Sequence, residues 1–110
     1  DSLDMTANDR EKILAACQTS DDSRIIISHG TDSIVETASL LGQEVKDKTV
    51  ILVGAMIPYS IRNSDALFNL GCAVTAVQLL GNGVYVVMNG QVFPWDNVQK
   101  NRNQGVFQQH

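Results

Sequence analysis

Short runs of consecutive apolar residues alternate with amphipathic stretches along this chain. Three of the runs are rich in β-branched side chains and bounded by polar residues or glycine, which is typical of buried strands. They are Arg24–Ser28, Thr49–Val53 and residues 84–88. Strands that are apolar throughout, rather than alternating, are expected where helices cover both faces of a parallel sheet. The pattern therefore predicts three parallel strands at the centre of a layered fold.

Two helices are predicted from apolar residues at helical spacing before the second strand. Thr6 and Asp9 resemble a capping box, so the first helix is expected to begin there and to run to about Cys17, with an apolar face of Ile13, Leu14 and Cys17. The second helix is expected from Asp32 to near Leu41. Gly42 follows at the position where a C-cap glycine would end that helix.

The remaining segments complete an α/β pattern. Ser64 can cap a third helix, with a predicted apolar stripe of Leu67, Leu70, Val74, Val77 and Leu80. Asn89-Gly90 is a tight-turn dipeptide and predicts a short hairpin after the third strand, and the sequence beyond Pro94 is predicted to be irregular. We therefore predict an α/β, three-layer domain of the Rossmann or flavodoxin type, with a mainly parallel sheet and flanking helices.

Composition narrows the possible partners. The chain has 110 residues, of which 44% are hydrophobic and 18% charged, as expected for one small domain. Twelve acidic against 8 basic residues give a formal net charge of -4, which argues against nucleic acid as a partner. The apolar runs are too short to span a bilayer, so no membrane partner is expected. Cys17 and Cys72 have no metal-like spacing and are interpreted as two small buried thiols; no metal or cofactor is predicted.

The first strand leads directly into His29-Gly30-Thr31-Asp32, where a ligand site is expected. Ligands of open α/β sheets bind at the carboxyl ends of the strands. No glycine-rich phosphate-binding motif is present, and Asp32 would place a carboxylate where a phosphate would lie, so a cation such as a substrate ammonium fits better. The alternative is that Thr31 or Asp32 simply caps the following helix.

A catalytic interpretation requires a base for the Thr31 hydroxyl. Threonine is a weak nucleophile unless a neighbouring group accepts its proton, and a lysine can do so where its surroundings favour the neutral amine. Lys100 is the candidate because it lies beyond the third strand, whereas Lys12, Lys46 and Lys48 are interpreted as solvated charges. The alternative for Lys100 is also an ordinary surface charge.

Several motifs in order resemble one enzyme family. Residues 27–33, with Glu36-Thr37-Ala38 downstream, resemble the H-G-T-D signature of the bacterial-type L-asparaginases and glutaminase-asparaginases. Further stretches agree in the same order: Asp1-Ser2-Leu3-Asp4-Met5 resembles the family's substrate loop, and Val53-Gly54-Ala55-Met56 the segment after its next strand. Ser64-Asp65 through Asn69-Leu70 resembles its S-D-G-x-x-N-L helix start, and Val98-Gln99-Lys100 falls where the family carries its catalytic lysine.

The resemblance implies hydrolysis of L-asparagine, with L-glutamine as a further possible substrate, through a threonine nucleophile and an acyl-enzyme. By this match Thr31, Asp32 and Lys100 form one of two catalytic constellations, in which Lys100 accepts a proton and Asp32 orients it. Asp32 would also receive the substrate α-ammonium. The implied substrate-binding residues are Asp1, Ser2, Gly30, Thr31, Asp32 and Ala55, with Ser2 on the α-carboxylate and the Gly54-Ala55 backbone on the side-chain amide. His29 is interpreted as structural, hydrogen-bonded at the strand end.

Departures from the family pattern matter as well. The family's opening T-G-G-T-I segment, which carries its primary catalytic threonine, has no counterpart here, and the chain ends soon after Lys100. Ala66 replaces a usual glycine, and Ile57-Pro58 resembles the cytoplasmic branch. The resemblance thus implies the middle part of the N-terminal domain of a longer, cytoplasmic, homo-oligomeric enzyme, with little activity in this chain alone.

Two other function classes remain open at the level of sequence. One is a non-catalytic amino-acid-binding module that kept the pocket, which would bind aspartate or asparagine without turnover. The other is an ammonia-releasing subunit related to the tRNA-dependent amidotransferases, which would be distinguished by additional tRNA-contacting segments.

Overall fold

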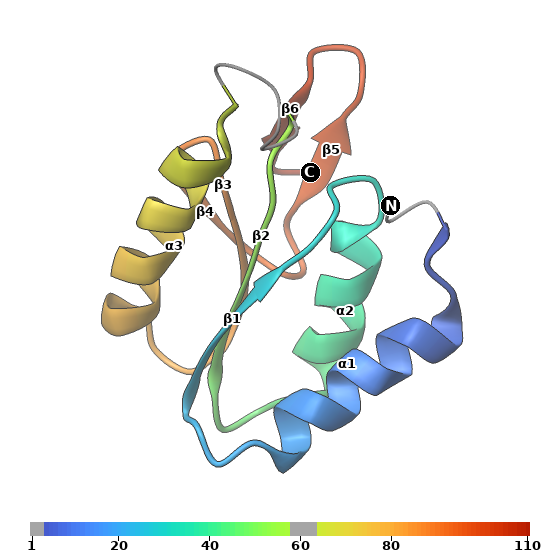
Figure 1. Cartoon of the computed structure of the whole chain (residues 1–110), viewed down its shortest axis with the longest axis vertical. Helices are drawn as coiled ribbons and strands as arrows, with labels where there is room; N and C mark the ends of the chain where they lie inside the picture. Colours follow the sequence, from blue (N-terminus) through green and yellow to red (C-terminus); the bar gives the residue numbers. More distant parts are fainter. Residues whose placement is uncertain (1–3, 58–63) are drawn as a thin grey trace.

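A sheet with helices on both faces forms the centre of the structure (Figure 1), which is a computed structural model that describes residues 4–57 and 64–110. The sheet has the strand order β1-β2-β3-β4. Strands β1, β2 and β3 are parallel, and β4 returns antiparallel to β3. Their bounds are β1 (Arg24–Ser28), β2 (Thr49–Val53), β3 (Gly83–Met88) and β4 (Gln91–Pro94).

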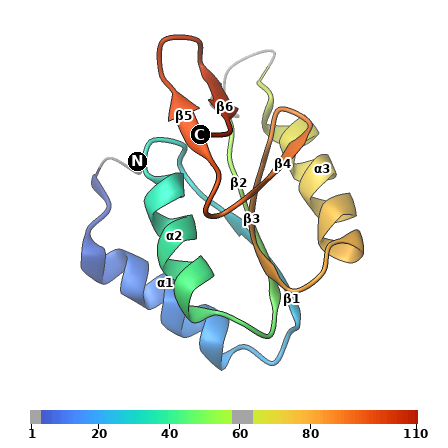
Figure 2. The same ribbon diagram turned by 180° about the vertical axis from the view of Figure 1, so that it is seen from behind.

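The helices make the outer layers. Helices α1 (Ala7–Thr19) and α2 (Ile34–Glu44) lie on one face of the sheet and α3 (Ala66–Leu79) on the other, as the two opposite views show (Figures 1 and 2). A separate hairpin of β5 (Gln99–Asn101) and β6 (Val106–Gln108) lies at the end of the molecule where α2 begins. The predicted three-layer α/β architecture with a mainly parallel sheet is confirmed.

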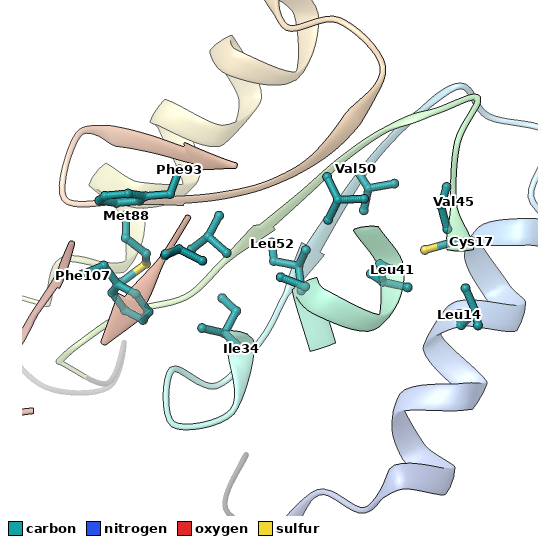
Figure 3. Packing of buried hydrophobic residues seen from close by; sticks show 14 residues of the cluster. Leu14, Cys17, Ile34, Leu41, Val45, Val50, Leu52, Met88, Phe93 and Phe107 are labelled. Atoms are coloured by element: carbon teal, nitrogen blue, oxygen red, sulfur yellow. The ribbon is translucent and has the colours of Figure 1, made fainter. Parts of the chain in front are cut away.

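The central strand β2 shows why the strands are apolar throughout. All five of its residues are buried. Because side chains alternate between the faces of a strand, Val50 and Leu52 pack into the core beneath α1 and α2, whereas Ile51 and Val53 pack into a second core beneath α3. Figure 3 shows the larger core, which extends from Leu14 of α1 to the aromatic rings at the opposite end.

The start of α1 agrees with its sequence pattern. The Asp9 amide donates to the Thr6 hydroxyl over 3.2 Å, and the Asp9 carboxylate accepts from the Thr6 amide over 2.9 Å, which completes the predicted capping box. Leu14 and Cys17 are buried as predicted, and the helix continues two residues beyond Cys17 to Thr19.

The starts of the other two helices differ from prediction. Helix α2 begins at Ile34, with Ser33 at its N-cap position, rather than at Asp32. The reason is that the Asp32 side chain is directed to a hydrogen bond with the β5–β6 hairpin instead of back to α2. Helix α3 has Asp65 at its N-cap position, although the Ser64 hydroxyl does accept a hydrogen bond from the Ala66 amide over 3.1 Å.

Gly42 does not end α2, and that prediction was wrong. The helix runs through it to Glu44, and Gly42 is buried. A Cβ atom at Gly42 would overlap the indole ring of Trp95, which follows β4. The glycine is therefore needed for close packing between α2 and the chain after β4, not for a helix cap.

Replacing Gly42 with alanine is expected to lower the free energy of unfolding by about 1–3 kcal/mol, the usual effect of overfilling a packed site. Gly71→Ala in α3 is the matched control, because no atom of the residues that the structure describes lies within 4 Å of a Cβ added there. Alanine in that exposed helical position is expected to stabilise by about 0.5–1 kcal/mol. Urea unfolding of both variants measures the two changes, and equal effects would contradict the packing argument.

The predicted apolar stripe of α3 was largely wrong. Only Val77 of the five residues is buried; Leu67 is 65% exposed, and Leu70 and Val74 are also exposed. The face against the sheet consists instead of Asn69, Ala73 and Val77 at intervals of four. The inner face was predicted from the spacing of apolar residues alone, and a buried asparagine is not found in that way.

The C-terminal part contains one confirmed and one incorrect prediction. The turn between β3 and β4 uses Asn89 and Gly90 at φ angles of 56° and 75°, the left-handed region that this dipeptide favours. The segment beyond Pro94 is not irregular, because it forms β5 and β6. These strands are short and polar and are anchored by buried Val98 and Phe107, too few apolar positions to produce a strand pattern.

Two smaller predictions were also wrong. Cys17 is buried as expected, and burial raises the pKa of its thiol, but Cys72 is only half-buried. Lys48 is not a solvated charge: it is 8% exposed, and its ammonium donates to the Ser20 carbonyl.

Within residues 4–57 and 64–110, we find no helix of the length and apolarity needed to cross a membrane.

Candidate active site

Thr31 and Asp32 lie in the turn that leaves the carboxyl end of β1 and enters α2. The His29 amide donates to the Val53 carbonyl over 2.8 Å, so the pairing of β1 with β2 continues one residue past the strand. After that bond the chain turns at Gly30, which brings Thr31 and Asp32 to the edge where parallel strands end together.

His29 fixes the geometry of this turn. Its side chain is buried, and Nδ1 donates to the Gly30 carbonyl over 2.7 Å. Nε2 lies 2.8 Å from the hydroxyl of Thr37, one turn into α2. His29 is thus hydrogen-bonded at the strand end as predicted, and both its ring nitrogens are used in holding the turn against α2.

The β5–β6 hairpin carries Lys100 to the same place. Lys100 is registered opposite Phe107, and cross-strand partners project on the same face of a hairpin. Phe107 is buried in the core, so the face it shares with Lys100 is turned toward the sheet end rather than toward solvent. The packing of one aromatic side chain thereby directs the lysine.

The structure brings Thr31, Asp32 and Lys100 into direct contact. Lys100 Nζ lies 2.9 Å from Thr31 Oγ1 and 2.7 Å from Asp32 Oδ1. The lysine side chain is 13% exposed and that of Asp32 is 28% exposed. An amine within hydrogen-bond reach of a hydroxyl, with a carboxylate to orient it, is the arrangement in which a lysine can take a proton from threonine.

Arg102 joins this cluster and was not selected from the sequence. Its Nη1 lies 2.9 Å from Asp32 Oδ1, the oxygen that also accepts from Lys100, and its Nη2 donates to the Asp32 backbone carbonyl over 3.2 Å. The only available signal was its position two residues after Lys100. Such a spacing indicates that two side chains are close only within a known element, and this segment was predicted to be irregular. Because the β5–β6 hairpin was not predicted, the contact of Arg102 with Asp32 was not predicted either.

The cations around Asp32 determine its protonation. The hydrogen bond from Lys100 is the largest influence, and with the nearby charges of Lys100 and Arg102 it outweighs desolvation and holds the pKa of the Asp32 carboxyl below its ordinary value. The ionised form therefore persists to more acidic pH in the folded chain than in the unfolded chain.

This shift predicts the pH dependence of the Asp32 contribution to stability. With a lowered folded-state pKa, the contribution is complete above the unfolded carboxyl value of about 3.9 and is lost as pH falls through the folded value. The difference in unfolding free energy between the wild type and Asp32→Asn is expected to be constant near neutral pH and to shrink in acid. Urea unfolding at a series of pH values tests this, with Asp47→Asn as the control for losing one negative charge. A difference that grows in acid would contradict it.

Gly30 and Ala55 lie beside this cluster, in the wall of a cavity of about 540 Å³ at the carboxyl ends of β1 and β2. The first turn of α3 closes the opposite side of the cavity with Ala66, Leu67 and Leu70. The predicted substrate-binding residues Gly30 and Ala55 thus line one cavity, together with Gly54, which is packed against Thr31. Asp1 and Ser2, the other predicted substrate-binding residues, lie outside the described residues.

A hydrogen-bonded pair behind the cavity also was not selected as functional. The Asp65 carboxylate accepts from the backbone amides of Met56 over 3.0 Å and Ile57 over 2.9 Å, and from the Asn69 side chain over 2.9 Å. Burial raises the pKa of Asp65, but these hydrogen bonds outweigh it and leave the pKa below its ordinary value. The available signals were the spacing of Asp65 and Asn69, one helical turn apart at the start of α3, and their place in the S-D-G-x-x-N-L motif that the sequence resembles.

Comparisons with known proteins agree with this geometry. The family model described as "Asparaginase, N-terminal" matches residues 1–108. L-asparaginase 2 of Escherichia coli (strain K12) is 42% identical over 94 residues, which cover 82% of this chain and 26% of that protein. The thermostable L-asparaginase from Thermococcus kodakarensis superposes with a TM-score of 0.89 at 30% identity, covering 99% of this chain and 35% of that one.

A second solved structure, the probable cytoplasmic L-asparaginase from Campylobacter jejuni, gives a TM-score of 0.82 at 33% identity and covers 91% of this chain and 35% of that one. Other curated relatives are named as a glutaminase-asparaginase and as one subunit of a glutamyl-tRNA(Gln) amidotransferase. The chain spans about a quarter of the length of the curated relatives it matches. The match of the family model over residues 1–108, with the similarity to solved L-asparaginase structures, shows that the chain belongs to the asparaginase family and matches that family's N-terminal domain.

Proposed function

We propose that the full-length protein containing this chain hydrolyses L-asparagine to L-aspartate and ammonia. The observation that carries the proposal is the contact of Lys100 Nζ with Thr31 Oγ1 at 2.9 Å and with Asp32 Oδ1 at 2.7 Å. Lys100 is 69 positions from Thr31 and 68 positions from Asp32 in the sequence. The three side chains nevertheless meet in the geometry of a hydroxyl, its base and the group that orients the base. A helix cap would require no such lysine.

In this proposal the three side chains have different roles. The neutral form of Lys100 accepts the Thr31 proton, and Asp32 holds the amine in line and receives the substrate α-ammonium. The Thr31 oxygen forms a bond to the amide carbon, the carbon–nitrogen bond breaks, and the departing nitrogen takes the proton held by Lys100 and leaves as ammonia. Water then hydrolyses the ester, which releases L-aspartate and returns a proton to the Thr31 oxygen. The backbone of Gly30 and Ala55 lines the space for the substrate, and Asp1 and Ser2 bind its α-amino-acid end.

The rest of the site belongs to other parts of the parent protein. We place the second constellation, with the primary catalytic threonine, and the C-terminal domain outside these 110 residues. We also place the parent in the cytoplasm as a homo-oligomer. Ile57-Pro58, which resembles the cytoplasmic branch, and the similarity to the Campylobacter jejuni protein support the location. Light scattering of the purified full-length protein tests the oligomer.

The test is release of ammonia by the full-length protein, measured with L-asparagine and L-glutamine in parallel. We expect turnover of L-asparagine, and Thr31→Ala is the inactive control. Calorimetric binding of aspartate without turnover of either amide would favour the amino-acid-binding module instead.

An amidotransferase role is the second candidate, because one relative is named as part of a glutamyl-tRNA(Gln) amidotransferase. It predicts that ammonia release is slow with free amino acids and rises when a partner protein and an aminoacyl-tRNA acceptor are added. Fast hydrolysis of free L-asparagine by the full-length protein alone would exclude this role as its main one.

A further inference from the structure

Asn69 is an unusual residue for the inner face of α3. Its side chain is completely buried, with 0% exposure, although an unpaired amide in such a place costs free energy. The side-chain amide is fully used: Nδ2 donates to the Gly54 carbonyl over 3.0 Å and to Asp65 Oδ2 over 2.9 Å, and Oδ1 accepts from the Asn89 amide over 3.0 Å. Asn69 therefore ties α3 to the loop after β2 and to the β3–β4 turn.

Ser64 and Asp65 extend this network along the loop after β2. Asp65 accepts from the amides of Met56 and Ile57, and the Ser64 hydroxyl donates to the Ile57 carbonyl over 2.6 Å. Together with the Asn69 bond to Gly54, these contacts fix the backbone of residues 54–57 at both ends. The start of α3 thus determines where this loop lies.

The loop in turn forms one side of the candidate active site. A Cβ atom on Gly54 would overlap the His29 carbonyl oxygen and would lie 3.1 Å from the Thr31 methyl carbon. Gly54 is therefore packed directly against the turn that presents the Thr31 hydroxyl. Ala55, the next residue, lines the adjoining cavity. A displacement of the loop would move both the wall of the cavity and the neighbour of Thr31.

We propose that Asp65 and Asn69 are positioning residues for the reaction at Thr31: they hold residues 54–57 at the distance from Thr31 and the bound amide that catalysis requires. This inference rests on the proposed function. A residue chosen for packing alone would be apolar at this buried position, because leucine has the same branched arrangement of four side-chain heavy atoms as asparagine and needs no hydrogen-bond partner. The asparagine instead provides hydrogen bonds to the backbone that borders the site.

Asn69→Leu and Asp65→Asn in the full-length protein test this role. The first removes the bonds of the Asn69 side chain to Gly54, Asp65 and Asn89. The second replaces one carboxylate oxygen by an amide nitrogen that cannot accept from a loop amide. Both are expected to lower kcat/KM for L-asparagine about 10- to 100-fold, with KM raised at least about 3-fold, because small misplacements in an active site are costly. Hydrogen exchange of the peptide spanning residues 54–57 is expected to quicken at least about 10-fold.

Val77→Ala is the matched control. Val77 lies on the same buried face of α3, two turns beyond Asn69, and its removal weakens the helix packing without touching the loop. We expect it to lower the melting temperature while kcat, KM and loop exchange remain within about 2-fold of the wild type.

The outcomes separate the two proposals. An inactive wild type with a protected loop would overturn the proposed function. Asn69→Leu or Asp65→Asn with wild-type kcat/KM, or with unchanged loop exchange, would overturn the positioning role. So would an equal loss of kcat/KM in Val77→Ala, since the effect would then be one of general stability. If Asn69→Leu does not fold, Asp65→Asn, which lies nearer the surface, decides the question by the same measurements.

Discussion

Replacing Lys100 with arginine in the full-length protein is expected to lower kcat for L-asparagine by at least ~100-fold, with KM changed much less. Arginine keeps the positive charge and can still pair with Asp32, but a guanidinium does not give up its proton in proteins and cannot accept one from Thr31. The loss of general-base help is usually worth ~100-fold or more. Steady-state ammonia release measures kcat and KM separately.

The control for this substitution is Lys12→Arg, on the exposed side of α1, which is expected to leave both constants unchanged. The Asp32 contact helps to interpret the result, because Lys100 Nζ and Arg102 Nη1 share one carboxylate oxygen. If Lys100 only supplied charge, arginine would supply it equally well. A kcat close to that of the wild type would therefore make Lys100 a structural charge and remove the base from the proposed mechanism.

The 110-residue chain by itself is expected to hydrolyse L-asparagine at least about 1000-fold more slowly than the full-length protein. Catalytic groups that act together lose several orders of magnitude when one is removed. The proposed site needs a second threonine that this chain does not contain in the expected motif. Ammonia release from equal molar amounts of the two proteins measures the ratio.

Two checks make that comparison decisive. Circular dichroism must show that the short chain is folded, because an unfolded chain would be inactive for another reason. The Thr31→Ala form of the short chain gives the background from contaminating amidases. Turnover by the short chain near that of the full-length protein, absent in its Thr31→Ala form, would mean that Thr31, Asp32 and Lys100 suffice for hydrolysis.

The central strands could be predicted from the sequence because their buried positions are occupied mostly by apolar residues. Every residue of β2 is buried, and only Thr49 at its start is polar, so four consecutive apolar residues mark the strand. The same reasoning failed for α3, whose inner face includes Asn69. There the stabilising partners are backbone groups from other segments, which no local pattern contains.

Some residues of the candidate site could be predicted from the sequence, and others could not. Thr31 and Asp32 could be predicted from their place after an apolar strand, and Lys100 from the family resemblance. Arg102 and the position of Lys100 relative to Thr31 could not, because both depend on a hairpin whose strands have three residues each. What orients that hairpin is the burial of Phe107 and Val98 in the core, a tertiary contact that the local sequence pattern does not contain.

Because Gly42 of α2 packs closely against Trp95, the intrinsic fluorescence of this tryptophan reports on the position of α2. Trp95 is the single tryptophan, so all indole emission comes from the place where the segment after β4 meets α2. The opposite end of α2 follows Thr31 and Asp32. Separation of α2 from the sheet would expose this indole to water and shift its emission to longer wavelength. Fluorescence can thus distinguish a variant whose active-site turn has lost its supporting helix from one that has lost only a reacting group.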